Sequence, residues 1–380
     1  MWNKKKLFIV TTVPMSFIFF KGQLLKLREK FDVTLISSPE RALYETADFN
    51  KVKSHGIKMA REISLLSDLI SLFKLVIYFF KNQPDILHAN TPKGSLLSLT
   101  AARICKIPTR IYYIHGLRYQ GTTGLKKRLL MVMEKISCYF STEIIAVSKG
   151  VRDVLQNDKI TKKKVTVIWN GSANGIDLNY FDPSHSDVQD IRPAYAIAED
   201  EFVFGFLGRL VGDKGINELV EAFNQLNSEY PKIKLLLVGS YEDHLDPLRE
   251  ETISIIRRNG NIIEAGVQYD VRSHIKTMDL LVFPSYREGF GIVLMEAAAM
   301  NVPAICSDII GCNEIIEDHV NGFLIPQRNQ KALYSKMKYC LDHPAQVSQM
   351  SKVTRQMIAA KFEQEKLWAK TIEFYESITS

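Results

Sequence analysis

Short runs of β-branched and other apolar residues recur along the first half of the chain, and each is followed by a stretch with helical periodicity. These runs are Leu7 to Val13, Val33 to Ser37, Ile86 to His88, Arg110 to Tyr113, Ile144 to Val147 and Val165 to Ile168. Runs of this length bounded by turn residues predict strands. Their alternation with helices predicts βαβ units, and therefore a parallel sheet with helices on both faces.

A second series of the same kind begins at Val203. Its predicted strands are Val203 to Leu207, Lys234 to Val238, Asn261 to Glu264, Leu280 to Pro284 and Pro303 to Cys306. Between the two series, the polar, proline-marked segment Phe181 to Pro193 is typical of a linker. We therefore predict an α/β chain of two facing, doubly wound, Rossmann-like domains, residues 1–182 and 183–361, with a helix over 362–380 packing back on the first domain. The strand ends would then meet at an interdomain cleft.

The composition agrees with two soluble domains. The chain has 380 residues, 46% hydrophobic and 24% charged, which excludes collagen-like and disordered classes. Its five cysteines form no Cys-x-x-Cys pair, so neither a zinc site nor a disulfide framework is predicted, and a reducing cytoplasm fits best. The net charge of +7 suits a nucleic acid, an anionic membrane or a phosphorylated substrate. Because no nucleic-acid reader motif is visible, we predict no nucleic-acid partner.

Two apolar stretches bear on the location of the protein. Near the start, three lysines at positions 4–6 and the apolar run after them imitate a secretion signal. Pro14 interrupts that run, so we expect a buried first strand followed by a loop. The segment Ile63 to Phe80 has the length of a membrane span but carries Asp68 and Lys74, which predicts an amphipathic helix instead.

The strongest chemical signal is the segment Ser285 to Glu296, directly after a predicted strand. It contains Glu288, a Gly289-Phe290-Gly291 turn and the start of a helix, an order that places backbone N–H groups and a positive helix end where an anion binds. Helical spacing would separate Glu288 from Glu296 by about 12 Å, beyond the roughly 5 to 9.5 Å of glycosidase carboxylate pairs. We therefore expect separate roles for them, with two ordinary surface glutamates as the alternative.

A second cluster, Gly205 to Gly215, carries Arg209 and Lys214 among glycines. The chain lacks Gly-x-Gly-x-x-Gly at this cluster and has no Gly-Lys-Ser or Gly-Lys-Thr, which disfavours nicotinamide binding and P-loop hydrolysis. Two cations at the mouth of a parallel sheet suit a diphosphate, and a solvated turn with two surface charges is the alternative. In the first domain, His115 and the Gly22 turn also follow predicted strands and are candidate site residues. For His115, the alternative is a structural histidine that is hydrogen-bonded within the fold.

Taken in this order, these segments resemble the family 4 glycosyltransferases, nucleotide-sugar enzymes with the GT-B fold. The most specific part is Glu288 to Glu296, which matches the family's Glu-x7-Glu motif. Gly208-Arg209-Leu210 with Lys214-Gly215 is similar to the family's donor diphosphate site.

The resemblance implies a role for each site residue. It assigns Arg209, Lys214 and Gly22 to the donor diphosphate, Glu296 to the ribose hydroxyls, and Val267 and Gln268 to the uracil. It places Glu288 and the backbone of Gly289, Phe290 and Gly291 on the donor sugar, with His115 on the C6 side of that sugar. The catalytic residues are then Glu288, His115, Arg209 and Lys214. The sequence contains no Asp-x-Asp and has an excess of positive charge, so we expect Arg209, Lys214 and the helix start at Gly291 to neutralise the diphosphate, with no metal ion and no cofactor.

The same resemblance implies the reaction. The segments His115 to Tyr119 and Gly171 to Gly175 are similar to those of members that extend undecaprenyl-diphosphate-linked saccharides for capsule, O-antigen or glycoprotein assembly. The implied donor is a UDP-sugar, an N-acetylhexosamine or a deoxy relative, and the anomeric configuration is retained. A UDP-sugar hexosyltransferase or epimerase of the same fold and a non-catalytic sugar-nucleotide sensor are the alternatives.

A lipid-anchored acceptor would require the protein to bind a membrane. Leu125 to Tyr139 has the pattern of an amphipathic helix, with Lys126, Lys127 and Arg128 near its start. Basic and apolar faces together predict peripheral binding to an anionic cytoplasmic leaflet. A helix packed in the core with a solvated basic end is the alternative.

Overall fold

The computed structural model describes residues 4–60, 64–242 and 246–379, and the chain forms two compact units. The first unit is Met1–Gly175 with Gln364–Ser380, and the second is Ile176–Glu363. The structural boundary lies before the predicted one at 182/183, because residues just after 175 bond to the last helix of the second unit, α12 (Pro344–Phe362). The Ile176 N–H donates to the Phe362 carbonyl at 2.9 Å, and Arg355 donates to the Leu178 carbonyl at 2.8 Å.

The first unit is built on a seven-stranded parallel sheet with the order β3-β2-β1-β4-β5-β6-β7. Its strands are β1 (Lys6–Val10), β2 (Asp32–Ser37), β3 (Lys53–Gly56), β4 (Ile86–Asn90), β5 (Thr109–Ile114), β6 (Glu143–Ala146) and β7 (Val165–Thr166). Leu7, Ile9 and Ile111 are fully buried. Continuous apolar runs of this kind form central strands because helices cover both faces of a parallel sheet.

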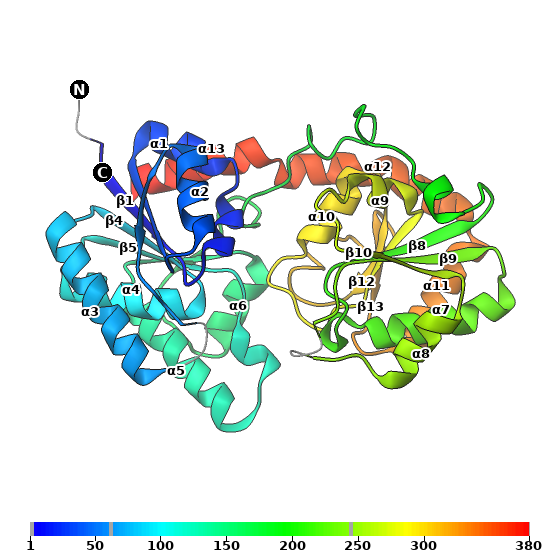
Figure 1. The fold of residues 1–380 in the computed structure, drawn as a ribbon, viewed down its shortest axis with the longest axis horizontal. Helices are drawn as coiled ribbons and strands as arrows, with labels where there is room; N and C mark the ends of the chain where they lie inside the picture. The colour runs from blue at the N-terminus through cyan, green and yellow to red at the C-terminus, as the bar shows by residue number, and fades with distance from the viewer. Residues whose placement is uncertain (1–3, 61–63, 243–245, 380) are drawn as a thin grey trace. The chain divides into compact units, whose positions relative to one another are not determined.

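Helices pack on both faces of the first sheet (Figure 1). One face carries α1 (Gln23–Lys30), α2 (Arg41–Asn50) and the returning α13 (Gln364–Ser377), and the other carries α3 (Leu65–Asn82), α4 (Pro92–Ile104) and α5 (Gly124–Phe140). The remaining helical segments are the short η1 (Pro14–Phe20), η2 (Arg118–Gly121) and α6 (Lys149–Asn157). The helix predicted from Ile63 is α3, and residue 63 itself lies outside the described residues. Within the described ranges, no helix has both the length and the hydropathy needed to cross a membrane.

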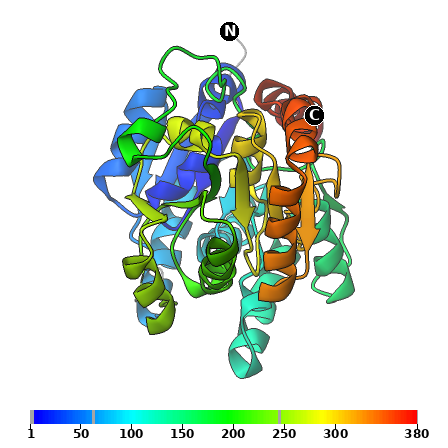
Figure 2. The same ribbon diagram turned by 90° about the vertical axis from the view of Figure 1, so that its right-hand side faces the viewer.

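The second unit repeats this arrangement around a six-stranded parallel sheet with the order β10-β9-β8-β11-β12-β13. Its strands are β8 (Phe202–Leu207), β9 (Ile233–Val238), β10 (Ile262–Gly266), β11 (Leu280–Phe283), β12 (Ala304–Ser307) and β13 (Gly322–Ile325). Helices α7 (Ile216–Glu229), α8 (Glu250–Arg258) and α11 (Gln330–Asp342) lie on one face, and α9 (Arg272–Thr277), α10 (Ile292–Ala299) and α12 lie on the other (Figures 1 and 2). The prediction of two doubly wound α/β domains is confirmed.

Candidate functional site

The strand order of the second unit brings four loop segments to one edge of its sheet. β10, β9, β8 and β11 are parallel neighbours, so the residues that follow them leave the sheet at the same end. These segments are residues 208–215, 239–242, 267–270 and 284–291. Three of them carry site residues predicted from the sequence, and we call this edge the donor edge.

Backbone contacts hold the loop after β8 against the loop after β11. Gly215 has a φ of +74°, and a Cβ atom there would lie 2.3 Å from the Pro284 carbonyl oxygen. Only glycine combines this backbone conformation with so close an approach. The Tyr286 N–H also donates to the Asp213 carbonyl at 2.9 Å. The two loops are therefore fixed side by side.

Each predicted cation of the donor edge has a carboxylate partner. Lys214 forms an ion pair with Glu288, both side chains are 15% exposed, and the Lys214 ammonium lies 5.4 Å from the centroid of the Phe283 ring. Arg209 pairs with Glu242 at 3.0 Å and is more open to solvent, with 41% of its side chain exposed. These ion pairs orient both cations. Phosphate oxygens form the same kind of charged contact with lysine and arginine.

The glycine turn before α10 is packed against the rest of the unit. Phe290 is buried, with its ring centroid 5.4 Å from that of Phe362. The Gly291 N–H donates to the Gly311 carbonyl at 3.0 Å. Of the three backbone groups predicted to bind a ligand, the N–H of Gly291 is therefore taken by the protein itself. Glu296 is half-buried in the second turn of α10.

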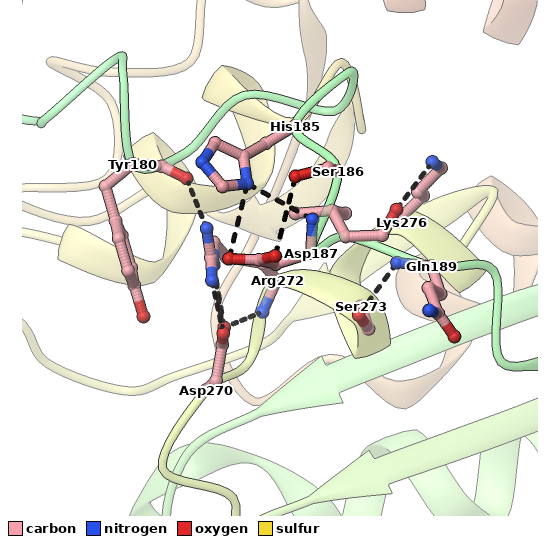
Figure 3. A network of polar contacts seen from close by, with 10 residues as sticks. Tyr180, His185, Ser186, Asp187, Gln189, Asp270, Arg272, Ser273 and Lys276 are labelled. Atoms are coloured by element: carbon pink, nitrogen blue, oxygen red, sulfur yellow. Dashed lines mark hydrogen bonds and ion pairs between the residues drawn. The ribbon is translucent and has the colours of Figure 1, made fainter.

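The loop after β10 is anchored at its far end by a polar network (Figure 3). Arg272 is buried, pairs with Asp270 at 2.6 Å and stacks on the Tyr180 ring, 4.0 Å from its centroid. Its guanidinium also donates to the Tyr180 carbonyl at 3.2 Å, which ties the loop to the segment that begins the second unit. Before this anchor, the Gln268 amide donates to a backbone carbonyl of β10 at 2.6 Å, and the Val267 side chain is exposed. Val267 therefore offers an apolar surface at the donor edge.

In the first unit, His115 meets η1 over the end of β4, because β4 lies between β1 and β5. The Nε2 atom of His115 is 2.9 Å from Oδ1 of Asn90, and its ring stacks on Phe19 with a centroid distance of 4.2 Å. Burial lowers the pKa of His115 to about 3, so the ring is neutral. In the tautomer that donates to Asn90, Nδ1 keeps its lone pair. This buried atom has no hydrogen-bond partner within the described part of the chain.

Gly22, the predicted phosphate contact of the first unit, has a packing role. Its φ is +80°, and a Cβ atom there would lie 2.5 Å from Cη2 of Trp368 in α13. The Trp368 Nε1–H donates to Asn174 at 2.8 Å, and Asn174 donates to the Lys21 carbonyl at 2.9 Å. The close approach of α13 therefore explains a glycine at this position, and the phosphate contact stays a prediction.

The sequence prediction missed the partners that orient the site residues. Asn90 is the last residue of β4, whereas the predicted strand ended at His88. A polar residue directly before Thr91-Pro92, where the next helix begins, was the available signal. Glu242 and Arg272 gave no signal, because a single charged residue in a loop is typical of any surface.

The prediction that the protein needs no metal ion is not tested by the fold. Among residues 4–60, 64–242 and 246–379, no three His, Cys, Asp or Glu side chains are grouped so that they could hold a metal ion. Metal independence stays a prediction, which the response of turnover to a chelator tests.

Two family models match consecutive parts of the chain. The model described as Glycosyltransferase Family 4 matches residues 25–173, and the model described as Glycosyl transferases group 1 matches residues 187–357. The first match falls in the first unit and the second match in the second unit.

Known proteins resemble the chain over most of its length. It is 32% identical over 375 residues to the capsular polysaccharide biosynthesis glycosyltransferase CapM of Staphylococcus aureus, which covers 98% of this chain and 97% of CapM. It is 26% identical over 302 residues to the UDP-Gal:alpha-D-GlcNAc-diphosphoundecaprenol alpha-1,3-galactosyltransferase of Escherichia coli, covering 78% of this chain and 76% of the relative. The crystal structure of Anabaena HepE in complex with UDP and glucose matches with a TM-score of 0.82 at 20% identity, covering 99% of this chain and all of HepE. The likeness to HepE bears on the fold and agrees with the predicted GT-B architecture.

Proposed function

The chain belongs to the family 4 glycosyltransferases, and we propose that it transfers a sugar from a UDP-sugar to a saccharide carried on a polyprenyl diphosphate during assembly of a surface polysaccharide. The proposed donor sugar is an N-acetylhexosamine or a deoxy relative. The names of the relatives support the acceptor class, because one names a capsular polysaccharide and the other a diphosphoundecaprenol-linked acceptor.

The observation that carries this proposal is the position of Lys214 and Arg209 at the same sheet edge as the Glu288 loop and α10. Departure of UDP builds negative charge on the pyrophosphate, and fixed cations stabilise that charge in the transition state. Because only 15% of the Lys214 side chain is exposed, its charge is screened less than a surface charge. We propose that these two cations neutralise the leaving group without a bound metal ion.

The other residues of the donor edge divide the remaining parts of the donor among them. Glu296 accepts hydrogen bonds from the ribose hydroxyls, since a carboxylate has room for both. The exposed side chain of Val267 and the neighbouring Gln268 flank the uracil. Glu288 binds the sugar hydroxyls. For His115 of the first unit, whose ring is neutral, we propose a contact with the C6 side of the sugar, as in the family that the chain resembles.

We propose that the anomeric configuration is retained, so that an α-linked UDP-sugar gives an α-linked product. The acceptor hydroxyl attacks C1 from the face that UDP leaves, the bond from C1 to the phosphate oxygen breaks, and the departing phosphate takes the acceptor proton. No covalent bond to the enzyme forms. The protein supplies position and charge stabilisation for this step.

The proposed acceptor lies in a membrane, and we propose that the enzyme binds the cytoplasmic face peripherally. Lys126, Lys127 and Arg128 at the start of α5 are exposed. Leu129 and Val132 are about half-exposed, at 49% and 50%. These exposures favour a helix that contacts lipid over a helix that packs in the core.

A transfer assay tests the proposal. The purified chain is incubated with a panel of UDP-sugars, with and without a synthetic polyprenyl-diphosphate saccharide, and products are identified by mass spectrometry and NMR. We expect a new α-linked saccharide only when acceptor is present. Conversion of one UDP-sugar into another without acceptor would indicate an epimerase, and donor binding without turnover would indicate a sensor. A β-linked product would contradict retention.

A further inference from the structure

Helix α3 exposes its most apolar side. Seven large hydrophobic side chains of this helix are between 40% and 80% exposed. They are Leu65, Leu66, Leu69, Ile70, Phe73, Ile77 and Phe80. A surface helix of a soluble protein ordinarily turns such residues toward the core, and a contiguous exposed apolar patch marks an interaction surface.

The orientation of α3 is fixed by what lies on its inner side. Asp68 pairs with the buried Lys93 of α4 at 2.6 Å, and the Ser71 hydroxyl donates to the Lys58 carbonyl at 2.7 Å. Leu75 is fully buried on the same side. Rotating the helix to hide its leucines would break the ion pair and leave charge buried without a partner, which is costly. The apolar side therefore faces outward because the polar contacts hold the other side inward.

Helix α5 carries a second apolar stripe on the same face of the sheet. Its exposed hydrophobic residues follow the 4-3-4-3 spacing of one helix side. They are Leu125, Leu129, Val132, Ile136 and Tyr139. Helix α4 packs against both α3 and α5, and Figure 1 shows the three helices along one face of the first sheet.

The charges on these three helices are all of one sign where they reach solvent. The exposed charged residues are Lys74, Lys81, Arg103, Lys126, Lys127, Arg128 and Lys135. The two carboxylates of these helices are withdrawn, because Asp68 pairs with Lys93 and the buried Glu134 accepts a hydrogen bond from the Tyr112 hydroxyl. All three helices lie within the described ranges, so this inventory of their charges is complete. Basic residues around an apolar stripe are the pattern of a helix that binds an anionic lipid surface.

We propose that α3 and α5 form a membrane-docking surface, in which the apolar side of α3 enters the headgroup boundary of an anionic bilayer and the basic residues bind its phosphate groups. The inference rests on the proposed function, whose acceptor is carried by a lipid. It adds that α3 supplies the larger apolar contact and α5 the basic cluster. A second copy of the chain is a poorer occupant, since pairing this surface with itself would bring seven cations against seven.

Vesicle flotation of the full chain tests the docking surface. We expect binding to vesicles of phosphatidylglycerol and phosphatidylcholine in equal parts, and much weaker binding to phosphatidylcholine alone. The variant Leu69→Ser/Phe73→Ser/Ile77→Ser should lower affinity at least about tenfold, because it removes the apolar contact. Replacing Lys126, Lys127 and Arg128 with glutamine should lower it roughly 100-fold.

The matched control replaces exposed apolar residues on the opposite face of the first sheet. Tyr44→Ser/Phe49→Ser changes α2, whose Phe49 is 79% exposed, and should bind vesicles like the wild type. All variants should keep the wild-type melting temperature and its increase with UDP, which shows that they fold. An α3 variant that binds vesicles as well as the control variant does would overturn the proposal.

The other outcomes separate this inference from the proposed function. Absence of wild-type binding to anionic vesicles overturns the docking surface. If the α3 variant instead abolishes dimers seen by analytical ultracentrifugation, or a stable complex with another protein, that partner occupies the surface and the lipid proposal is wrong. Vesicle binding with no sugar transfer to any lipid-linked acceptor would leave the docking surface supported and contradict the proposed function.

Discussion

Replacing Lys214 with alanine removes a cation that is 15% exposed and fixed beside the Glu288 loop. Loss of one preorganised contact to the developing charge of a leaving group costs about 2 to 4 kcal/mol of transition-state stabilisation. That range corresponds to a loss of roughly 30- to 900-fold in kcat/KM. The measurement is the steady-state rate of saccharide formation from UDP-sugar and lipid-linked acceptor.

The same substitution also leaves the Glu288 carboxylate without its partner in a site that is mostly withdrawn from solvent. Such an orphaned group costs about 1 to 3 kcal/mol of folding free energy. The double variant Lys214→Ala/Glu288→Gln removes the uncompensated charge, so it should recover most of the stability. It should not recover turnover, because the cation is still missing. Comparison with Glu288→Gln alone separates the loss due to the carboxylate from the loss due to the lysine.

Lys338 provides a matched control. Lys338→Ala removes another ion-paired lysine of the second unit, whose partner Glu229 lies 2.5 Å away, and should leave kcat/KM unchanged. If Lys214→Ala folds normally and retains more than about a third of the wild-type kcat/KM, Lys214 does not stabilise the leaving group. If the double variant is more active than Lys214→Ala, Lys214 acts only by neutralising Glu288.

Three further outcomes follow from the site and the first unit. Because burial holds the pKa of His115 near 3, its ring stays neutral between pH 5 and 9, and His115→Gln should lower kcat/KM roughly tenfold without changing the shape of the pH–rate profile in that range. Burial raises the pKa of Glu134 from 4.5 to about 7, so the folded chain binds a proton more readily than the unfolded chain in that interval, and unfolding free energy should fall as pH rises through it. Glu134→Gln should reduce the difference in unfolding free energy between pH 4.5 and pH 7 by roughly 1–3 kcal/mol, as measured by denaturant titration at the two pH values. An unchanged pH dependence would contradict the raised pKa of Glu134. EDTA in excess should leave turnover within about twofold of its value without chelator, and loss of activity that Mg²⁺ or Mn²⁺ restores would contradict metal independence.

The central strands and the donor edge were predictable because both depend on local sequence. The apolar runs at Leu7 and Val203 are continuous, as expected for strands covered on both faces. The order strand, glycine turn, helix around Gly289 is enough by itself to locate a loop at a sheet edge. By contrast, the edge strand β3 is the polar sequence Lys-Ser-His-Gly, so hydrophobic periodicity gave no signal for it.

Contacts between distant parts of the chain were beyond the sequence pattern. The approach of Trp368 to Gly22 joins positions more than three hundred residues apart, and nothing local to Gly22 distinguishes a packing glycine from a phosphate-binding one. The Asn90–His115 contact likewise depends on the pairing of β4 with β5 in the sheet. Tertiary contacts of this kind determine the tautomer and the pKa of a site histidine, and the residue type alone does not.

The amphipathic pattern of α3 was predictable, but the side that faces solvent was not. Hydrophobic periodicity predicts which residues share a side and assumes that the apolar side is inward. Here the side that carries Asp68, paired with Lys93 of α4, and the buried Leu75 faces inward, and seven other apolar residues face solvent. The periodicity of a single helix cannot predict an ion pair with a neighbouring helix.

The most direct test of the account is a crystal structure of the chain with UDP. We expect the pyrophosphate to lie within hydrogen-bonding distance of the Lys214 ammonium and the Arg209 guanidinium, with Glu296 on the ribose hydroxyls and no metal ion between the phosphates. A pyrophosphate bound away from Lys214 and Arg209, or held through a metal ion, would contradict the claim that fixed cations of the donor edge carry the leaving group.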